Sequence, residues 1–210
     1  MNIVLIGPQG SGKGTQARLL CDKFKFSYFE AGAFLREIAK TNEGVRRMLA
    51  EGKLVPDEEM SSYVISFLDE KGLYDGTLFD GFPRTLKQYK VFKSWLAVRS
   101  VKLGLAILLV ISEEETIRRL SARRMDPVTG KIYNLITDKP PVGLDEDKLI
   151  QREDDKPEAI KKRLTLYRVQ TEPLITELKR ETDVVEIDGE RSIEAIFKDL
   201  TSVIEERMNK

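Results

Sequence analysis

An apolar strand running into a glycine-rich loop near the N-terminus constrains the fold more than any other feature. The stretch is Ile3-Val4-Leu5-Ile6-Gly7-Pro8-Gln9-Gly10-Ser11-Gly12-Lys13-Gly14-Thr15. An unbroken apolar run is typical of a strand covered on both faces of a parallel sheet, and helical apolar spacing follows the loop. Backbone N–H groups of such a loop bind phosphate oxygens, and Lys13 would reach the outer phosphates. The pattern therefore predicts a phosphate-binding loop between a strand and a helix.

The loop departs in one place from the pattern G-x-x-x-x-G-K-[ST], which places a hydroxyl directly after the lysine. Here Gly14 follows Lys13, and Thr15 comes one residue later. The alternative is an ordinary glycine turn between a strand and a helix. That alternative gives the lysine little structural use, so we favour phosphate binding.

The composition excludes several classes of function. Thirty-five basic residues balance 35 acidic ones, so the net charge does not indicate a nucleic-acid partner. The chain has no histidine, which excludes Ser-His and Cys-His nucleophiles and an ordinary zinc site. Cys21 is the only cysteine, so no disulfide forms within the chain. With no visible targeting segment and no apolar run of bilayer length, we expect a cytoplasmic protein without a membrane partner.

Strand and helix patterns alternate along the chain and predict an α/β fold of the P-loop NTPase type, with a parallel sheet flanked by helices. Short helices punctuated by glycine over 30–59 predict a small inserted subdomain. Proline and glycine interrupt 122–156, which we interpret as a lid with a short hairpin strand at 131–133. The expected core is 1–29, 60–121 and 157–210. Asp57 is expected to be the N-cap of a helix.

A second candidate site follows the strand expected at 78–80. Asp80 at the end of that strand can hold the Mg²⁺ of a nucleotide, and the next turn would present Arg84. On one helix, Arg119 and Arg123 lie four residues apart, which by itself favours a solvated face paired with Glu113–Glu115. The cations together match phosphoryl transfer, which depends on positioned substrates and positive charge.

In five stretches the chain resembles the adenylate kinases and the wider nucleoside-monophosphate kinases. They occur in the family's order across essentially the whole chain: Gly7–Thr15, Gly52-Lys53-Leu54-Val55, Asp80-Gly81-Phe82-Pro83-Arg84-Thr85, Arg123-Arg124 and Arg152-Glu153-Asp154-Asp155. Gly-Lys-Gly-Thr is the family's own form of the loop. The resemblance implies reversible, Mg²⁺-dependent transfer of the terminal phosphoryl group of ATP to AMP, giving two ADP. The long lid resembles that of bacterial adenylate kinases, but it lacks the four cysteines with which some relatives bind zinc, so we expect magnesium alone.

The resemblance also implies roles for individual residues, and it overrides the solvated-face interpretation of the paired arginines. The catalytic cations would be Lys13, Arg84, Arg123, Arg152 and Arg163. The ATP site would comprise Gly10, Ser11, Gly12, Lys13, Gly14, Thr15, Arg119, Arg123, Tyr133 and Arg191. By the resemblance, the 30–59 insertion would bind the nucleoside monophosphate (NMP). The AMP site would comprise Ala31, Gly32, Arg36, Leu54, Val55, Gly81, Arg84, Gln88, Arg152 and Arg163. Magnesium would lie near Thr15 and Asp80, bound directly or through water. Asp154 and Asp155 would pair with basic residues at the base of the lid. The expected partners are small nucleotides, bound by a monomer.

One stretch departs from the family pattern. Adenylate kinases usually have Ser-Thr-Gly-Asp before the Leu-Arg of the second helix, whereas this chain has Glu30-Ala31-Gly32-Ala33. Alanine in place of the threonine resembles the UMP/CMP kinases, but Gln88 and the long lid resemble the adenylate kinases, and we favour AMP. A UMP/CMP kinase and a nucleotide-binding module with impaired catalysis remain alternatives. A regulatory GTPase is not favoured, because the chain has no Asn-Lys-x-Asp.

Overall fold

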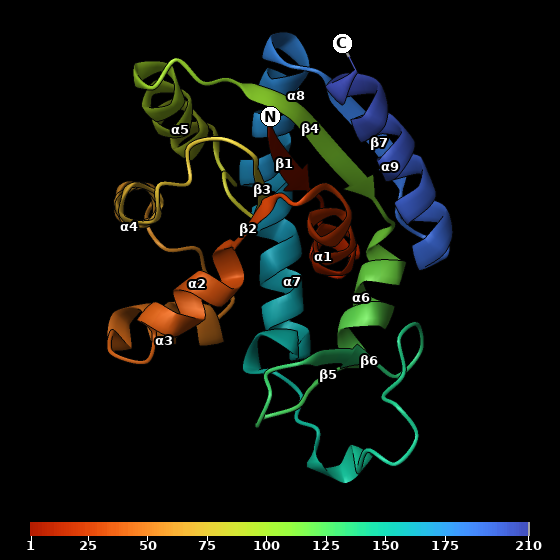
Figure 1. Cartoon of the computed structure of the whole chain (residues 1–210). Helices are drawn as coiled ribbons and strands as arrows, with labels where there is room; N and C mark the ends of the chain where they lie inside the picture. Colours follow the sequence, from red (N-terminus) through yellow and green to blue (C-terminus); the bar gives the residue numbers. More distant parts are fainter. Residues whose placement is uncertain (210) are drawn as a thin grey trace.

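The computed structural model describes residues 1–209, and its centre is one parallel sheet of five strands (Figure 1). In spatial order the strands are β2 (Ser27–Glu30), β3 (Thr77–Asp80), β1 (Asn2–Ile6), β4 (Leu103–Val110) and β7 (Val184–Asp188). All neighbouring pairs run parallel. The predicted α/β fold with a parallel sheet is confirmed.

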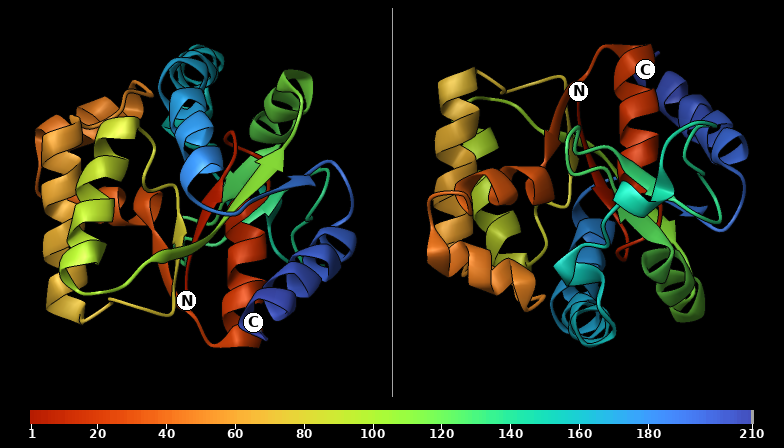
Figure 2. Two further views of the ribbon diagram at one scale, coloured as in Figure 1. Left: turned by 90° about the horizontal axis from the view of Figure 1, so that it is seen from above. Right: turned by 90° about the horizontal axis from the view of Figure 1, so that it is seen from below.

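Helices cover both faces of this sheet (Figure 2). They are α1 (Lys13–Phe24), α4 (Asp57–Lys71), α5 (Leu86–Val98), α6 (Glu113–Ser121), α7 (Pro157–Leu166), α8 (Glu172–Glu181) and α9 (Ile193–Met208). A π-helical turn, η3 (Tyr167–Thr171), joins α7 to α8. No helix within residues 1–209 is long and apolar enough to cross a membrane.

Strand β1 shows how the sheet separates two cores. Its side chains alternate between the faces. Ile3 and Leu5 pack with residues of α1 and α9, while Val4 and Ile6 pack with residues of α4, α5 and α8. All five residues of β1 are buried, as expected for a central parallel strand.

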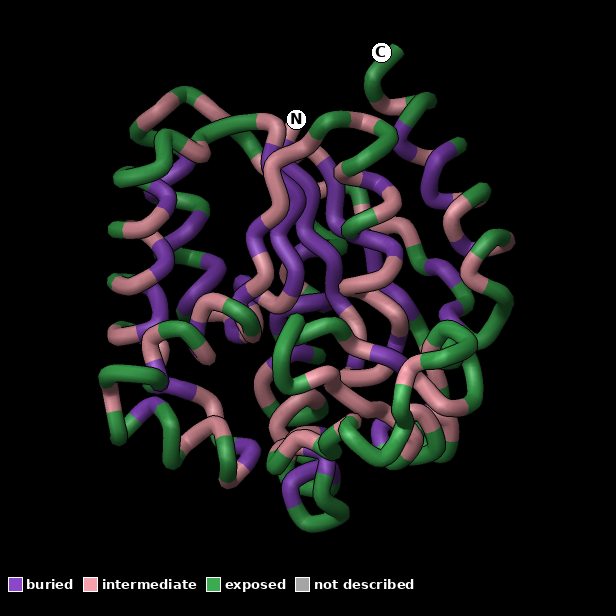
Figure 3. Tube along the Cα trace, turned by 60° about the horizontal axis from the view of Figure 1, so that its bottom comes forward, coloured by how far each residue is buried: buried purple, intermediate pink, exposed green. Residues whose placement is uncertain are grey.

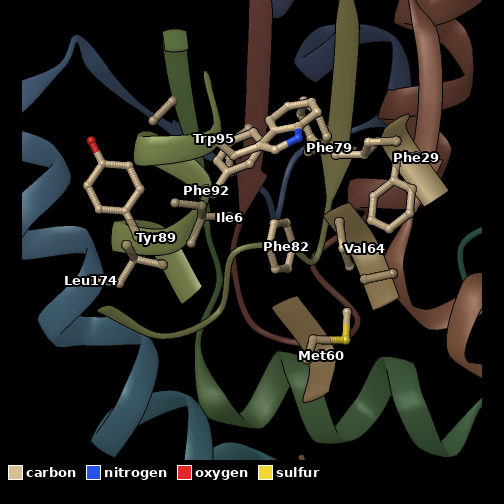
Figure 4. Packing of buried hydrophobic residues seen from close by; sticks show 14 of the residues in the cluster. Ile6, Phe29, Met60, Val64, Phe79, Phe82, Tyr89, Phe92, Trp95 and Leu174 are labelled. Carbon is tan, nitrogen blue, oxygen red and sulfur yellow. The ribbon is translucent and has the colours of Figure 1, made fainter. Parts of the chain in front are cut away.

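An aromatic cluster on the α4–α5 face holds the segment that follows β3 (Figure 4). The rings of Phe79 and Phe92 lie 4.9 Å apart, and Phe82 lies 5.5 Å from Phe92. Phe82 is fully buried although it belongs to a turn rather than a strand or helix. Core packing therefore anchors the turn from Gly81 to Arg84 and fixes the position of the Arg84 backbone.

Two groups of elements project from the core. Helices α2 (Ala31–Ile38) and α3 (Glu43–Ala50) lie together on one side, and an antiparallel hairpin lies below the sheet in Figure 1. The hairpin pairs β5 (Arg123–Met125) with β6 (Ile132–Asn134), and 3-10 turns follow at η1 (Glu146–Lys148) and η2 (Glu153–Asp155). Figure 3 shows buried strands at the centre and a mostly exposed chain around the hairpin. The strand predicted at 131–133 exists as β6, but its partner β5 was not predicted.

The predicted cap at Asp57 is wrong. Helix α4 begins at Asp57 itself, with Pro56 at the N-cap position and no side-chain cap hydrogen bond. Proline suits this end because its missing N–H removes no helical hydrogen bond. The Asp57 carboxylate instead accepts hydrogen bonds from Thr85 and Gln88 at the start of α5.

Candidate active site

The register of the sheet brings the glycine loop and Asp80 to the same edge. Leu5 of β1 lies opposite Asp80 of β3, so the loop that leaves β1 faces the carboxyl end of β3. Ligands of open parallel sheets bind in crevices outside the carboxyl ends of the strands. The topology therefore predicts the site at this edge.

Within the loop, Lys13 folds back over the preceding backbone. Gly10 and Gly12 have φ angles of 81° and 91°, which glycine adopts without strain. The Lys13 ammonium donates to the carbonyl oxygens of Gly7 and Pro8, both at 2.8 Å. Burial lowers the pKa of Lys13 to about 8; the Asp80 carboxylate opposes this effect, and nearby arginines add to it. The ammonium is thus positioned at the mouth of the loop with few compensating charges.

The Asp80 carboxylate lies against the start of α1. A Cβ atom added to Gly14 would stand 3.6 Å from Asp80 Oδ2, and the Tyr28 hydroxyl lies 3.2 Å from the same oxygen. Burial raises the pKa of Asp80, and the Lys13 ammonium opposes the shift. Asp80 and Thr15 line the same cleft. Carboxylate and hydroxyl oxygens are ligands suited to Mg²⁺, so this donor set fits the ion. Within residues 1–209, no group of three His, Cys, Asp or Glu side chains could hold a metal by itself.

A group of arginines and aspartates joins the hairpin to α7. Asp155 is fully buried and accepts from Arg123 Nε at 2.7 Å. Asp154 pairs with Arg152 at 2.9 Å and with Arg163 at 3.1 Å. Burial would raise the pKa of Asp154, but these guanidinium groups hold it below its usual value. Burial lowers the pKa of Arg163 to about 10, which leaves it charged at neutral pH. The predicted pairing of both aspartates with basic residues is confirmed.

The structure also bears on the two arginines expected to share one helix. That expectation is wrong, because α6 ends at Ser121 and Arg123 begins strand β5. Glu115 pairs with Arg119, as the solvated-face interpretation expects, and also with Arg118. Hydrogen bonds from Arg118 and then Arg119 lower the pKa of Glu115 to about 2. However, the Arg119 side chain is only 11 % exposed, and its guanidinium donates to the Gly10 carbonyl at 3.3 Å. Arg119 therefore lies against the glycine loop.

Two clefts meet at this edge of the sheet. The residues predicted to bind AMP all line the first: Ala31, Gly32, Arg36, Leu54, Val55, Gly81, Arg84, Gln88, Arg152 and Arg163. The residues predicted to bind ATP and magnesium all line the second: Gly10, Ser11, Gly12, Lys13, Gly14, Thr15, Asp80, Arg119, Arg123, Tyr133 and Arg191. Both clefts share a wall, which we call the cationic wall: Lys13, Arg36, Arg84, Arg152 and Arg163, together with Gln9 and Gly32.

Three residues near the site were missed from the sequence. Gln9 lines both clefts, and within residues 1–209 its buried Oε1 has no hydrogen-bond partner. Glu30 pairs with Arg36 at 3.0 Å and reaches Arg18 at 3.5 Å. Asp57 accepts a hydrogen bond from the Gln88 side chain. A polar residue inside the glycine loop was a visible signal for Gln9. No sequence signal distinguishes Glu30 or Asp57 from other acidic residues, because their partners lie elsewhere along the chain.

Comparisons with known proteins agree with this geometry. The family model described as Adenylate kinase matches residues 5–183. An adenylate kinase of Petrotoga mobilis is 35 % identical over 212 residues, covering 97 % of each chain. An adenylate kinase of Fusobacterium nucleatum is 37 % identical, covering 97 % of this chain and 98 % of its own. One of Kosmotoga olearia is also 37 % identical, covering 98 % and 99 %. The chain belongs to the adenylate kinase family.

Proposed function

We propose that this protein transfers the terminal phosphoryl group of ATP to AMP, reversibly, giving two ADP. The observation that carries the proposal is the cationic wall between the two clefts. A phosphoryl group that passes between two bound nucleotides must cross such a boundary. Positive charge on both sides stabilises the charge spread over its oxygens.

The second cleft is the proposed donor site. The loop from Gly10 to Thr15 would hold the ATP phosphates, and Lys13 would leave its backbone carbonyls to reach them. Arg119 would lie against the adenine and Arg123 against a phosphate, with Tyr133 and Arg191 at the rim. Thr15 and Asp80 would hold Mg²⁺, directly or through water. When bound, the ion neutralises phosphate charge and orients the donor.

The first cleft is the proposed acceptor site. Arg36 and Arg84 would hold the acceptor phosphate, Leu54 and Val55 would contact the sugar and base, and Gln88 would hydrogen-bond the base. Ala31, Gly32 and Gly81 would line the path between them. Arg152 and Arg163 would bridge the transferring group, because both stand in the cationic wall. Removal of one such arginine can cost on the order of a thousandfold in rate.

The proposed reaction requires little proton transfer. The acceptor oxygen belongs to a phosphate that is already anionic near neutral pH, so a strong general base is unnecessary. Positioning and charge stabilisation are the remaining demands, and the cations meet them. Water must be excluded, because it would compete as acceptor. We assign this task to residues 122–156 as a lid, and acceptor binding to residues 30–59. We assign residues 1–29, 60–121 and 157–210 to the core, of which residue 210 lies outside the described residues.

We further propose that the protein acts as a monomer in the cytoplasm on small nucleotides alone. A single cysteine suits a reducing compartment. The balanced charge offers no broad basic surface for nucleic acid. Size-exclusion chromatography with light scattering tests the monomer.

An acceptor competition tests the function. ADP production from Mg·ATP is measured with AMP, UMP, CMP and GMP, singly and in competition. We expect AMP to have the highest kcat/KM. A higher value for UMP or CMP would show that Ala31 outweighs Gln88 in base selection and would make the protein a UMP/CMP-type kinase. ATP binding without turnover of any acceptor would show a nucleotide-binding module.

A further inference from the structure

We propose that Asp57 determines base specificity by fixing the orientation of the Gln88 carboxamide. The fixed amide would accept a base that carries an amino group beside a ring nitrogen acceptor and would disfavour the corresponding oxo base. Asp57 is thus a positioning residue, and it is not among the residues that line the acceptor cleft. The inference rests on the proposed function and identifies a determinant of its base preference.

The two ends of the Gln88 amide have partners of opposite character. Gln88 is only 2 % exposed and lies in the first turn of α5. Its Nε2 donates to Asp57 Oδ1 at 2.9 Å, and its Oε1 accepts from the Arg84 backbone N–H at 2.8 Å. An ionised carboxylate only accepts hydrogen bonds, and a backbone N–H only donates them. These partners therefore assign the amide oxygen and nitrogen and favour one orientation.

The reversed amide would meet two unfavourable contacts. Its oxygen would face the Asp57 carboxylate, and its nitrogen would face the Arg84 N–H. Both hydrogen bonds would be lost in a buried place, where unpaired polar groups are costly. Asp57 supplies the stronger of the two restraints, because hydrogen bonds to a charged group are stronger than those between neutral groups.

Asp57 is itself held in place by α5. The Thr85 hydroxyl donates to Asp57 Oδ1 at 2.8 Å and accepts from the Gln88 backbone N–H at 3.1 Å. The hydroxyl therefore links the first residue of α4 to the N-cap of α5. Because Asp57 caps no helix, its carboxylate is committed to Thr85 and Gln88.

The amide keeps one N–H and one lone pair for a ligand. Adenine presents an amino N–H beside a ring nitrogen acceptor, which complements this pair. Hypoxanthine has nearly the same shape but presents an oxo group beside a ring N–H, so it requires the reversed amide. AMP and IMP therefore form the matched pair of acceptors that isolates the effect.

The experiment compares Asp57→Asn with Glu58→Gln. Both variants remove one negative charge from the first turn of α4, but Glu58 is the exposed neighbour. kcat/KM for AMP and for IMP is measured at saturating Mg·ATP, together with KM for ATP. Asparagine at 57 can donate as well as accept, so it would tolerate the reversed amide. We expect Asp57→Asn to lower the AMP:IMP ratio about tenfold, mainly through KM, with an absolute gain for IMP. Glu58→Gln should keep the wild-type ratio.

The outcomes separate the inference from the proposed function. An unchanged AMP:IMP ratio in Asp57→Asn, or an equal loss for both acceptors, would overturn the role of Asp57. Failure of the wild-type protein to prefer AMP in the acceptor competition would overturn the proposed function instead. Should Asp57→Asn not fold, Asp57→Ala provides the same test, because it removes the charged acceptor that fixes the Gln88 amide.

Discussion

At the scale of single residues, Lys13 couples nucleotide binding to pH. Its ammonium is held by two loop carbonyls and little else, and burial lowers its pKa to about 8. The group is protonated below that pH and neutral above it, whereas bound phosphates favour the protonated form. We expect the affinity of the free protein for Mg·ATP to fall as pH rises above 8, by up to about tenfold per pH unit. Isothermal titration calorimetry between pH 7 and 9.5 measures the Kd for Mg·ATP.

The control for this prediction is Lys13→Met. This variant should bind Mg·ATP weakly, show no such pH dependence and have no turnover. A wild-type affinity that is constant over the range would show that Lys13 does not titrate there. Near-normal turnover by Lys13→Met would contradict the assignment of the phosphate loop.

The roles of residues 30–33 could not be predicted from the sequence. Glu30 has an extended backbone, and α2 begins at the next residue, so its side chain can turn back to Arg36. Glu30 therefore places a carboxylate on Arg36, an arginine of the acceptor cleft. Glu30 also accepts from Tyr28, whose hydroxyl lies near Asp80 as well. Ala33 is exposed on α2, and nothing in the structure explains it.

At the scale of elements, the turn η2 ties the hairpin to α7 through Asp155. This carboxylate is 0 % exposed and pairs with Arg123, itself largely buried, while Arg163 stands 3.5 Å away. Removing one partner of a buried pair leaves the other charge uncompensated. Asp155→Asn should therefore lower the free energy of unfolding by roughly 3–5 kcal/mol. Urea denaturation followed by circular dichroism measures the loss.

A matched variant lies on the same turn. Glu153 is 67 % exposed, and among residues 1–209 it pairs only with the exposed Lys156. Glu153→Gln should cost between about 0 and 1 kcal/mol, as surface pairs do. Similar small losses in both variants would show that Asp155 is not a structural anchor.

Helices and strands with a clear period of apolar residues were predictable from the sequence. A strand that depends on hydrogen bonding to another strand was not. Helix α9 spans Ile193–Met208, where apolar residues recur at helical spacing, and Ser192 is its N-cap. Strand β5 has only the sequence Arg-Arg-Met and no apolar alternation, so it exists through its pairing with β6.

The spacing of the motifs predicted residues that line both clefts. It could not predict Asp57, whose partners Thr85 and Gln88 lie about thirty residues away.

At the scale of the whole molecule, two outlying segments flank one central sheet. The pair α2–α3 lines the first cleft and reaches the second only through Gly32 and Arg36 of the cationic wall, whereas the hairpin β5–β6 lines the second alone. Only the cationic wall is common to both. Each nucleotide should therefore first order its own segment, because contacts that a ligand makes in one cleft stabilise only the elements that line it.

Hydrogen exchange can resolve these two effects. Without ligand, β1 and β4 should exchange slowest, since they are buried centrally, and residues 126–148 fastest, since they are mostly exposed. Mg·ATP alone should slow exchange around β5–β6 and in the glycine loop more than in α2–α3. AMP alone should do the reverse. Equal protection of both segments by AMP alone would mean that the clefts are not independent sites. Lys13→Met provides the control. If Mg·ATP protected β5–β6 equally in this variant, the lysine would contribute nothing to ATP binding. The phosphate loop would then not be the donor site.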